Sequence, residues 1–332
     1  MADNKGVLII AEFVNGALAP IAKEMLGAAR KLAGELGEDV SAALIGSGVA
    51  GAAPEAISFG ADKVYIVDDP LLKDYRTDSY VAVAEKVIKQ ANPRIVLAGQ
   101  TTIGRDMTPR LAFRLGTSVT LDCIDLAIDA GTKFLLKTKP VYGGNARAIF
   151  SSEQMPQMAT VRAKAMTALA PDGGRKGETI TIAAGLDAAA IRTNVLQKVV
   201  AEVTGIKLED APIIVTGGRG MGGPEGFKQL EELAKILKGA VGATRPPCDS
   251  GWVPETMQIG LTGKIVSPDT YIAVALSGSS QHMAGCSGSK NIIAINRDAE
   301  ANIFKEARFG VIGDWKKIIP AFQTKIKELL GR

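Results

Sequence analysis

A glycine-rich segment in the second half of the chain has the spacing of a phosphate-binding loop. Residues 216–224 read TGGRGMGGP and contain the pattern G-x-G-x-x-G from Gly218, between a strand-like run and a predicted helix. Backbone N–H groups at a helix start attract phosphate, because the helix dipole places partial positive charge there. A nicotinamide site also needs an acid about 20 residues further on, where this chain has Thr244 and Arg245. The pattern therefore indicates either a phosphate site of another kind or a tight glycine turn without a ligand.

A second segment combines hydroxyl and amide side chains with the only histidine of the chain. Residues 276–285 read LSGSSQHMAG, follow a predicted buried strand and run into a predicted short helix with Ser at its cap. Their hydroxyl groups could bind a pyrophosphate, and His282 could donate a hydrogen bond to an electron-rich ring atom. The alternative is a buried histidine whose hydrogen bonds are satisfied within the protein. Ligands collect at the carboxyl ends of strands in open α/β sheets, so two such segments in one domain favour a dinucleotide.

Two basic residues lie between these segments. Arg245 stands at a predicted strand end, where it could stack on a planar ring or clamp an anion. Alternatively, it caps a helix or pairs with Asp249. Lys264 is interpreted as a solvated surface lysine.

The first two hundred residues alternate predicted strands with predicted helices. Residues 7–13 form a continuous apolar run of strand length, and residues 19–36 place apolar side chains at helical spacing. Strands that are apolar on both faces and joined by helices indicate a doubly wound, mostly parallel sheet. The further strand candidates are residues 40–45, 63–67 and 94–98, followed by residues 134–140, 147–150 and 159–165 as added strands that close this domain.

A second, smaller α/β domain is predicted from about residue 211. Residues 170–187, rich in Gly, Asp and Ala, are predicted to be loop or linker. The domain boundary is placed in a linker near residues 190–210, which gives domains 1–200 and 201–332. The predicted strands of the second domain are residues 213–216, 240–243, 271–276 and 292–296, and its predicted helices are residues 224–238 and 315–330.

Composition excludes several classes of function. The chain has 332 residues, 46% of them hydrophobic, so it can bury sizeable cores, and its net charge of +4 is too small to indicate a nucleic-acid partner. A single histidine excludes a His-rich metal site, and three widely spaced cysteines fit a reducing compartment. The first residues resemble neither a secretory signal nor a transit peptide, and no apolar run approaches the length of a membrane span. We therefore expect a cytoplasmic protein without membrane insertion, metal or nucleic acid.

Short segments of the chain carry a family resemblance that extends over its whole length. They are residues 140–146 (PVYGGNA), 249–254 (DSGWVP), 258–264 (QIGLTGK), 277–282 (SGSSQH) and 293–298 (IAINRD). In this order and spacing they resemble the alpha subunits of electron-transfer flavoproteins. The resemblance implies FAD in a C-terminal Rossmann-like domain of the deoxyhypusine-synthase-like type. It also implies a bacterial heterodimer, in which the N-terminal domain contacts a beta subunit that holds AMP or a second FAD.

The resemblance also implies particular site residues. Arg219 and the loop of residues 277–282 would hold the phosphates and the ribityl chain. Thr262 would bind the flavin N5, Arg245 would lie against the isoalloxazine, and His282 would face the pyrimidine C2 carbonyl. The whole implied cofactor set is Arg219, Thr244, Arg245, Ile259, Gly260, Leu261, Thr262, Ser277, Gly278, Ser279, Ser280, Gln281, His282, Asn296, Asp314 and Trp315, with the last three at the adenosine end. Leu261 stands where many members have Gln, so a side-chain amide contact is absent there.

The implied function is electron carriage between dehydrogenases of the acyl-CoA dehydrogenase type and a downstream acceptor. Such carriage stabilises an anionic flavin semiquinone, and a hydrogen bond to a charged group contributes roughly 1.5–3 kcal/mol. His282 and Arg245 could therefore set a useful potential without a proton-abstracting base. One alternative is the alpha subunit of an electron-bifurcating flavoprotein that oxidises NADH with a second FAD in the partner. Others are a stand-alone NAD- or flavin-dependent oxidoreductase and a nucleotide-binding module without redox function.

Overall fold

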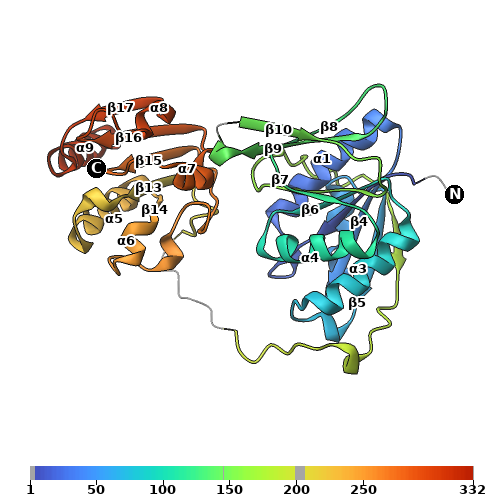
Figure 1. Cartoon of the computed structure of the whole chain (residues 1–332). Coiled ribbons are helices and arrows are strands. Elements are labelled where there is room, and N and C mark those ends of the chain that lie inside the picture. The colour runs from blue at the N-terminus through green and yellow to red at the C-terminus, as the bar shows by residue number, and fades with distance from the viewer. Residues whose placement is uncertain (1–3, 145, 199–205, 332) are drawn as a thin grey trace. The chain divides into compact units, whose positions relative to one another are not determined.

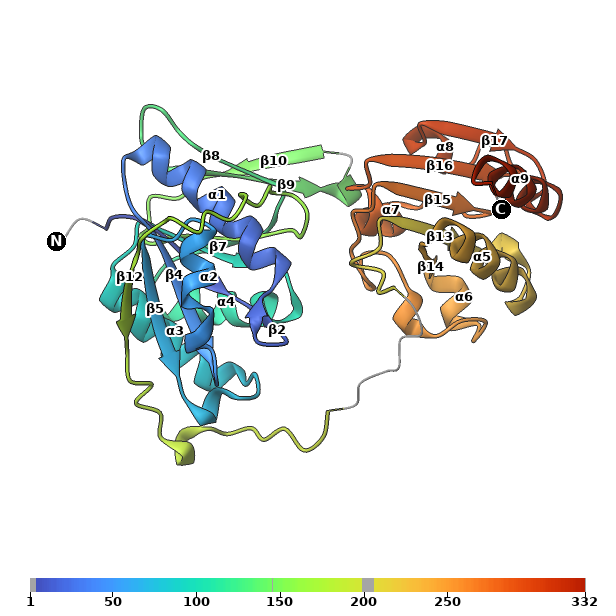
Figure 2. The ribbon, with the colours of Figure 1, turned by 180° about the vertical axis from the view of Figure 1, so that it is seen from behind.

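The computed structural model describes residues 4–144, 146–198 and 206–331. The chain divides into two compact units, Met1–Pro140 with Arg147–Val199, and Val141–Ala146 with Val200–Arg332. Each unit has its own β-sheet with helices on both faces (Figures 1 and 2). Part of the predicted linker, residues 199–205, lies outside the described residues. Among the described helices, none is both long and apolar enough to cross a membrane.

The first unit is built on a seven-stranded parallel sheet with the order β12-β5-β4-β1-β6-β11-β7. Its central strand β1 (Val7–Ala11) is buried on both faces, as a continuous apolar run predicts. Val7 and Ile9 pack on the side of helices α1 and α2, whereas Leu8 and Ile10 pack on the side of α3 and α4. The other strands are β4 (Val40–Gly46), β5 (Lys63–Asp68), β6 (Ile95–Gly99), β7 (Val119–Cys123), β11 (Gln157–Val161) and β12 (Glu178–Thr181), and the helices are α1 (Pro20–Leu36), α2 (Ala53–Ser58), α3 (Thr77–Ala91) and α4 (Thr102–Arg114).

Two small antiparallel sheets complete this unit. The first pairs β2 (Phe13–Val14) with β3 (Ala17–Leu18). The second has the order β10-β9-β8, formed by β8 (Asp125–Ile128), β9 (Leu135–Val141) and β10 (Ala146–Phe150). The prediction that all late strands are additions was therefore wrong for β11, which lies between β6 and β7 in the main sheet. Its run QMATV is fully buried, as a strand covered on both faces must be.

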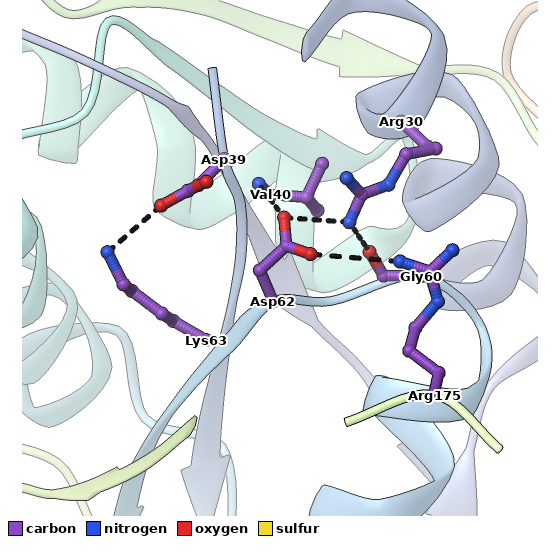
Figure 3. Close-up of polar contacts among 7 residues, drawn as sticks. All are labelled: Arg30, Asp39, Val40, Gly60, Asp62, Lys63 and Arg175. Atoms are coloured by element: carbon purple, nitrogen blue, oxygen red, sulfur yellow. Dashed lines mark hydrogen bonds and ion pairs between the residues drawn. The ribbon is translucent and has the colours of Figure 1, made fainter. Parts of the chain in front are cut away.

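The prediction of a loop or linker over residues 170–187 was wrong in part, because β12 lies within it. An ion-pair network docks this segment on the start of β5 (Figure 3). The Asp62 carboxylate accepts the Val40 N–H at 2.9 Å and lies 2.8 Å from the Arg30 guanidinium and 3.7 Å from that of Arg175. Backbone bonding continues beside it, since the Glu178 N–H donates to the Asp62 carbonyl at 2.8 Å. Polar composition conceals this edge strand, because side chains at an exposed edge need not be apolar.

The second unit is a five-stranded parallel sheet with the order β14-β13-β15-β16-β17. Helices α5 and α9 pack on one face, and α7 and α8 pack on the other. The strands are β13 (Ile213–Gly217), β14 (Ala240–Ala243), β15 (Thr270–Val274), β16 (Asn291–Asn296) and β17 (Phe309–Ile312), and the helices are α5 (Pro224–Leu237), α6 (Arg245–Asp249), α7 (Ser280–Cys286), α8 (Ile303–Glu306) and α9 (Trp315–Leu329). Every strand and long helix predicted here is present, and the additions are α6, α8 and β17.

Candidate nucleotide-binding site

The second unit carries a cavity of about 290 Å³ at the carboxyl edge of its sheet. The chain passes from β13 to β14 on one side and returns to β15 on the other, so the strand order reverses between β13 and β15. Such reversals open a crevice in which α/β proteins bind ligands. The cavity is lined by Arg219, Gly220, Thr244, Pro246, Ala275, Leu276, Ser277, Gly278, Ser279, His282, Asn296, Arg297, Asp298 and Ala301.

The glycines after β13 serve close packing, and Arg219 lies at the cavity. The N–H groups of Gly218 and Gly220 donate to the carbonyls of Val274 and Ala275 at 3.0 and 3.1 Å. A Cβ atom at Gly218 would lie 2.4 Å from the Ala275 carbonyl oxygen, so only glycine fits beneath the end of β15. These two N–H groups are thus not available to phosphate, and the alternative of a tight glycine turn describes them. The phosphate contact expected of Arg219 stays a prediction.

The loop after β15 forms the opposite wall. Gly278 has φ +75°, and a Cβ atom there would lie 2.4 Å from the Ile303 backbone nitrogen. This left-handed turn, which favours glycine, leads into α7 through Ser279. The Ser279 side chain makes no capping hydrogen bond. The hydroxyl groups of Ser277 and Ser279 therefore line the cavity without a capping role in the described chain.

His282 lies in the wall of the cavity and is 5% exposed. Its Nδ1 is 3.0 Å from the Ile259 carbonyl oxygen, which can only accept, so we infer that Nδ1 carries the proton. Its Nε2, 2.9 Å from the Tyr271 hydroxyl, then accepts from that group. Burial lowers the pKa of His282 to about 4, although the bond to Ile259 opposes this shift. His282 is therefore neutral at pH 7 with both nitrogens engaged, and donation to a ligand would require one of these bonds to be exchanged.

The groups behind His282 are also uncharged. Burial raises the pKa of the Tyr271 hydroxyl well above its ordinary value and that of the Cys286 thiol to about 12. The Cys286 thiol donates to the His282 carbonyl oxygen at 3.6 Å. The cavity wall therefore contains the neutral imidazole of His282, with a neutral phenol and a neutral thiol in contact with this residue, and none of the three is a free base.

Residues 258–264 and Arg245 lie close by but do not line the cavity. The Thr262 hydroxyl accepts from the Gln258 amide at 2.9 Å, and the Leu261 N–H donates to the Gln281 carbonyl at 2.7 Å. Arg245 begins α6 and pairs with Asp249 at 3.1 Å, its side chain 65% exposed. Lys264, predicted to be a solvated surface lysine, is partly buried and forms an exposed ion pair with Glu209 at 2.9 Å.

Asn296 and Trp315, two of the three residues expected at the adenosine end, link segments at the strand ends through hydrogen bonds. The Asn296 amide donates to the Leu276 carbonyl at 2.8 Å, joining the ends of β16 and β15. The indole N–H of Trp315 donates to the Gly220 carbonyl at 3.1 Å. Asp314 caps α9 by accepting the Lys316 N–H at 3.0 Å. Of these three residues, only Asn296 lines the cavity.

Several other residues that line the cavity were not predicted from the sequence. The predicted site residues that line it are Arg219, Thr244, Ser277, Gly278, Ser279, His282 and Asn296. Arg297 and Asp298 follow directly on β16, so their place after a predicted buried strand was the available signal. Neither Arg219 nor Arg297 has an ion-pair partner among the described residues. Two unpaired guanidinium groups and the Ser277 and Ser279 hydroxyls fit the diphosphate of a dinucleotide. A cavity of this size is at the lower end for small ligands, so it would hold one part of such a molecule.

The first unit has a cavity of about 300 Å³ at its own strand-order reversal, between β1 and β6. The side chains of this cavity differ in chemistry from those of the cavity in the second unit. The Glu12 carboxylate accepts from the Thr101 hydroxyl at 2.7 Å, at the start of α4, and burial raises the pKa of Glu12. A carboxylate at this helix start disfavours a phosphate in the same place. No cluster that could hold a metal ion occurs among residues 4–144, 146–198 and 206–331.

Comparison with known proteins gives matches over nearly the whole chain. Residues 7–187 match the electron transfer flavoprotein domain, and residues 207–287 match the electron transfer flavoprotein FAD-binding domain. The chain is 46% identical to the electron transfer flavoprotein subunit alpha of Thermoanaerobacterium thermosaccharolyticum, over 99% of this chain and 100% of the relative. It is 42% identical to the protein of that name from Megasphaera elsdenii, over 100% and 99%. It is 37% identical to the protein FixB of Azotobacter vinelandii, over 99% and 93%.

Proposed function

Because the chain belongs to the family of electron transfer flavoprotein alpha subunits, we propose that it passes electrons from flavin-dependent dehydrogenases, such as the acyl-CoA dehydrogenase type, to a downstream acceptor. The chain is an FAD-binding electron carrier and pairs with a beta subunit. The same proposal includes two further points. The beta subunit holds AMP or a second FAD, and the complex acts in the cytoplasm.

The observation that supports this function is the cavity at the reversal between β13 and β15. Arg219 and Arg297, neither of which forms an ion pair with a described residue, supply positive charge in a lining that also contains Asp298, and Ser277 and Ser279 supply hydroxyl donors. We assign these four residues to the cofactor diphosphate. Bound FAD supplies the reversible uptake of electrons. The chain itself binds and orients the cofactor.

The neutral cluster of His282, Tyr271 and Cys286 supports a carrier over an enzyme that removes protons. A general base needs a free lone pair within reach of its substrate. The Nε2 lone pair of His282 already accepts from Tyr271 at 2.9 Å. These groups therefore offer no free base for proton abstraction, which electron carriage does not need.

The remaining predicted residues belong to the two ends of the cofactor. Arg245, Thr262, Leu261, Ile259 and Gly260 are proposed at the ring end, with Ser280, Gln281 and His282. Five of them, Arg245, Leu261, Thr262, Ser280 and Gln281, are exposed in the second unit, and a ring could lie against Arg245 and Leu261. Asn296, Asp314 and Trp315 are proposed at the adenosine end, where Asn296 and Trp315 link segments at the ends of β13, β15 and β16 and Asp314 caps α9.

The test is the visible absorption spectrum of the native heterodimer, with the released flavin identified and counted against protein. One FAD per heterodimer is expected, with AMP in the beta subunit. Two FAD molecules would favour the bifurcating version, which NADH oxidation would then check. A heterodimer without flavin would overturn the proposal and favour a nucleotide-binding module. As a matched pair, Arg219→Gln should lose FAD on dialysis, whereas Lys228→Gln, on exposed α5, should retain it.

A further inference from the structure

Lys137 is a lysine buried in the first unit. It lies on β9, two residues after Leu135, so both side chains point to the same face of the strand. Leu135 is 0% and Lys137 is 1% exposed, and Lys137 pairs across the sheet with the buried Leu126. A buried ammonium group is costly unless an anion or hydrogen-bond acceptors compensate it.

No residue of the described chain supplies that compensation. Lys137 has no ion pair and no hydrogen bond to any of residues 4–144, 146–198 and 206–331. The nearby Cys123 thiol is no counter-ion, because burial raises its pKa to about 12. The carboxylate of Asp122 is held by Arg162 through hydrogen bonds of 2.9 and 2.7 Å. Burial also lowers the pKa of Lys137, as expected for a cation without an anion beside it.

Lys137 opens on a cavity of about 400 Å³ between the ends of β7, β9 and β10. Lys139, two residues further along β9, also lines it. Three hydroxyl side chains complete the polar lining, those of Ser118, Thr120 and Ser151. The described residues that line the cavity include no carboxylate. Two ammonium groups and three hydroxyl groups form a donor set that suits an oxyanion.

We propose that this cavity, the Lys137 site, binds an oxyanion, a phosphate or carboxylate group. Lys137 and Lys139 neutralise its charge, and the Thr120 and Ser151 hydroxyls donate to its oxygens. The anion comes either from a small free molecule or from an acidic side chain of the beta subunit. A cation that is buried before its ligand arrives lowers the stability of the empty protein, so its presence is explained by what it binds.

The test measures the thermal midpoint of the FAD-loaded heterodimer against inorganic phosphate, with sodium chloride at matched ionic strength. Phosphate should raise the midpoint of the wild type, because a ligand that binds only the folded state stabilises it. Lys137→Met, of similar length and apolar, should have a higher midpoint without phosphate and no response to it. The control Lys176→Met removes an exposed lysine of the same unit and should respond like the wild type. Thr120→Val with Ser151→Ala keeps the lysine and should weaken the response, which covers a failure of Lys137→Met to fold.

A second experiment tests whether the anion is a carboxylate of the beta subunit. In that case the wild type does not respond to phosphate, and a carbodiimide joins Lys137 to a peptide of the beta subunit. Loss of a buried charge partner at an interface costs about 30-fold or more in affinity. Lys137→Met should then weaken subunit association by that factor. Absence of both a phosphate response and a weakened association would overturn the proposal, and flavin content should be the same in every variant.

Discussion

Acidification should destabilise the protein through His282. The folded protein holds this imidazole neutral, with a pKa of about 4 because of burial. In the unfolded chain the imidazole has its ordinary pKa near 6.5. Between these values the unfolded chain binds a proton that the folded protein does not bind, so the free energy of unfolding falls as the pH falls. Above pH 6.5 both states are neutral, and His282 makes no pH-dependent contribution.

The size of this effect follows from the two pKa values. One pKa unit corresponds to about 1.4 kcal/mol. The loss of stability due to His282 should therefore be about 2 kcal/mol at pH 5 and about 3 kcal/mol at pH 4. At 5% exposure, His282 is too buried for solvent to screen this effect substantially. Carboxylates also titrate in this range, so the effect must be measured as a difference between two proteins.

The matched variant is His282→Gln. An amide can donate to the Ile259 carbonyl and accept from the Tyr271 hydroxyl, but it does not titrate. Denaturant unfolding of both heterodimers at pH 4, 5, 6 and 7 gives the difference in the free energy of unfolding at each pH. A second readout is the imidazole NMR signal that disappears in the variant, since His282 is the only histidine of this chain.

The reasoning is refuted if that signal titrates at pH 6 or above, or if both proteins lose stability in parallel. Either result would mean that His282 is hydrated or faces an anion. The proposed tautomer, with Nδ1 protonated and Nε2 accepting from Tyr271, would then be wrong. Donation from His282 to the cofactor would become the better description.

Three further substitutions test the site. Tyr271→Phe leaves Nε2 of His282 without its donor and should cost about 1–3 kcal/mol in the free energy of unfolding; an unchanged denaturation midpoint would place the hydroxyl elsewhere. Gly278→Ala brings a Cβ atom to 2.4 Å from the Ile303 nitrogen at φ +75°, so flavin content should drop, whereas Gly222→Ala, at φ +79° with nothing within 4 Å, should keep its flavin. Arg245→Ala removes an exposed ion pair of about 0.5 kcal/mol or less, so it should leave unfolding unchanged but shift the redox potential; an unshifted potential would place Arg245 away from the ring.

Hydrophobic pattern predicted the parts of the fold that are buried on both faces. Residues 7–13 are apolar except for Glu12, and residues 213–216 and 240–243 carry no charged side chain; each run contains or forms a parallel strand. The edge strand β14 was predicted from its apolar run, whereas the edge strands β12 and β17 were missed because their side chains are mostly exposed. β12 carries Glu178 and Thr179, and β17 is exposed at all four positions, so neither has the composition of a buried strand.

The sequence predicted the site residues that lie at strand ends. It did not predict which backbone N–H groups are already hydrogen-bonded within the protein. Ser277, Gly278 and Asn296 follow buried runs, and they line the cavity as that position predicts. The glycine pattern from Gly218 predicted free N–H groups, yet those of Gly218 and Gly220 donate to the β15 end. Spacing alone cannot distinguish a glycine that admits a phosphate from one that admits a neighbouring strand. The Ala275 carbonyl at 2.4 Å from a Cβ atom on Gly218 decides between them.

The charge of the residues at the cavity determines which of them could tune a bound flavin. The cavity is lined by the charged side chains of Arg219, Arg297 and Asp298 and by His282. His282 contacts the buried Tyr271 and Cys286, and the pKa values of these three groups all lie far from 7. His282 and the two groups it contacts therefore stay uncharged across the neutral pH range. Charge that changes the potential must come from other groups, and Arg245 is the exposed cation proposed at the ring end. Tuning by Arg245 should accordingly weaken with added salt, while binding through the buried wall should not.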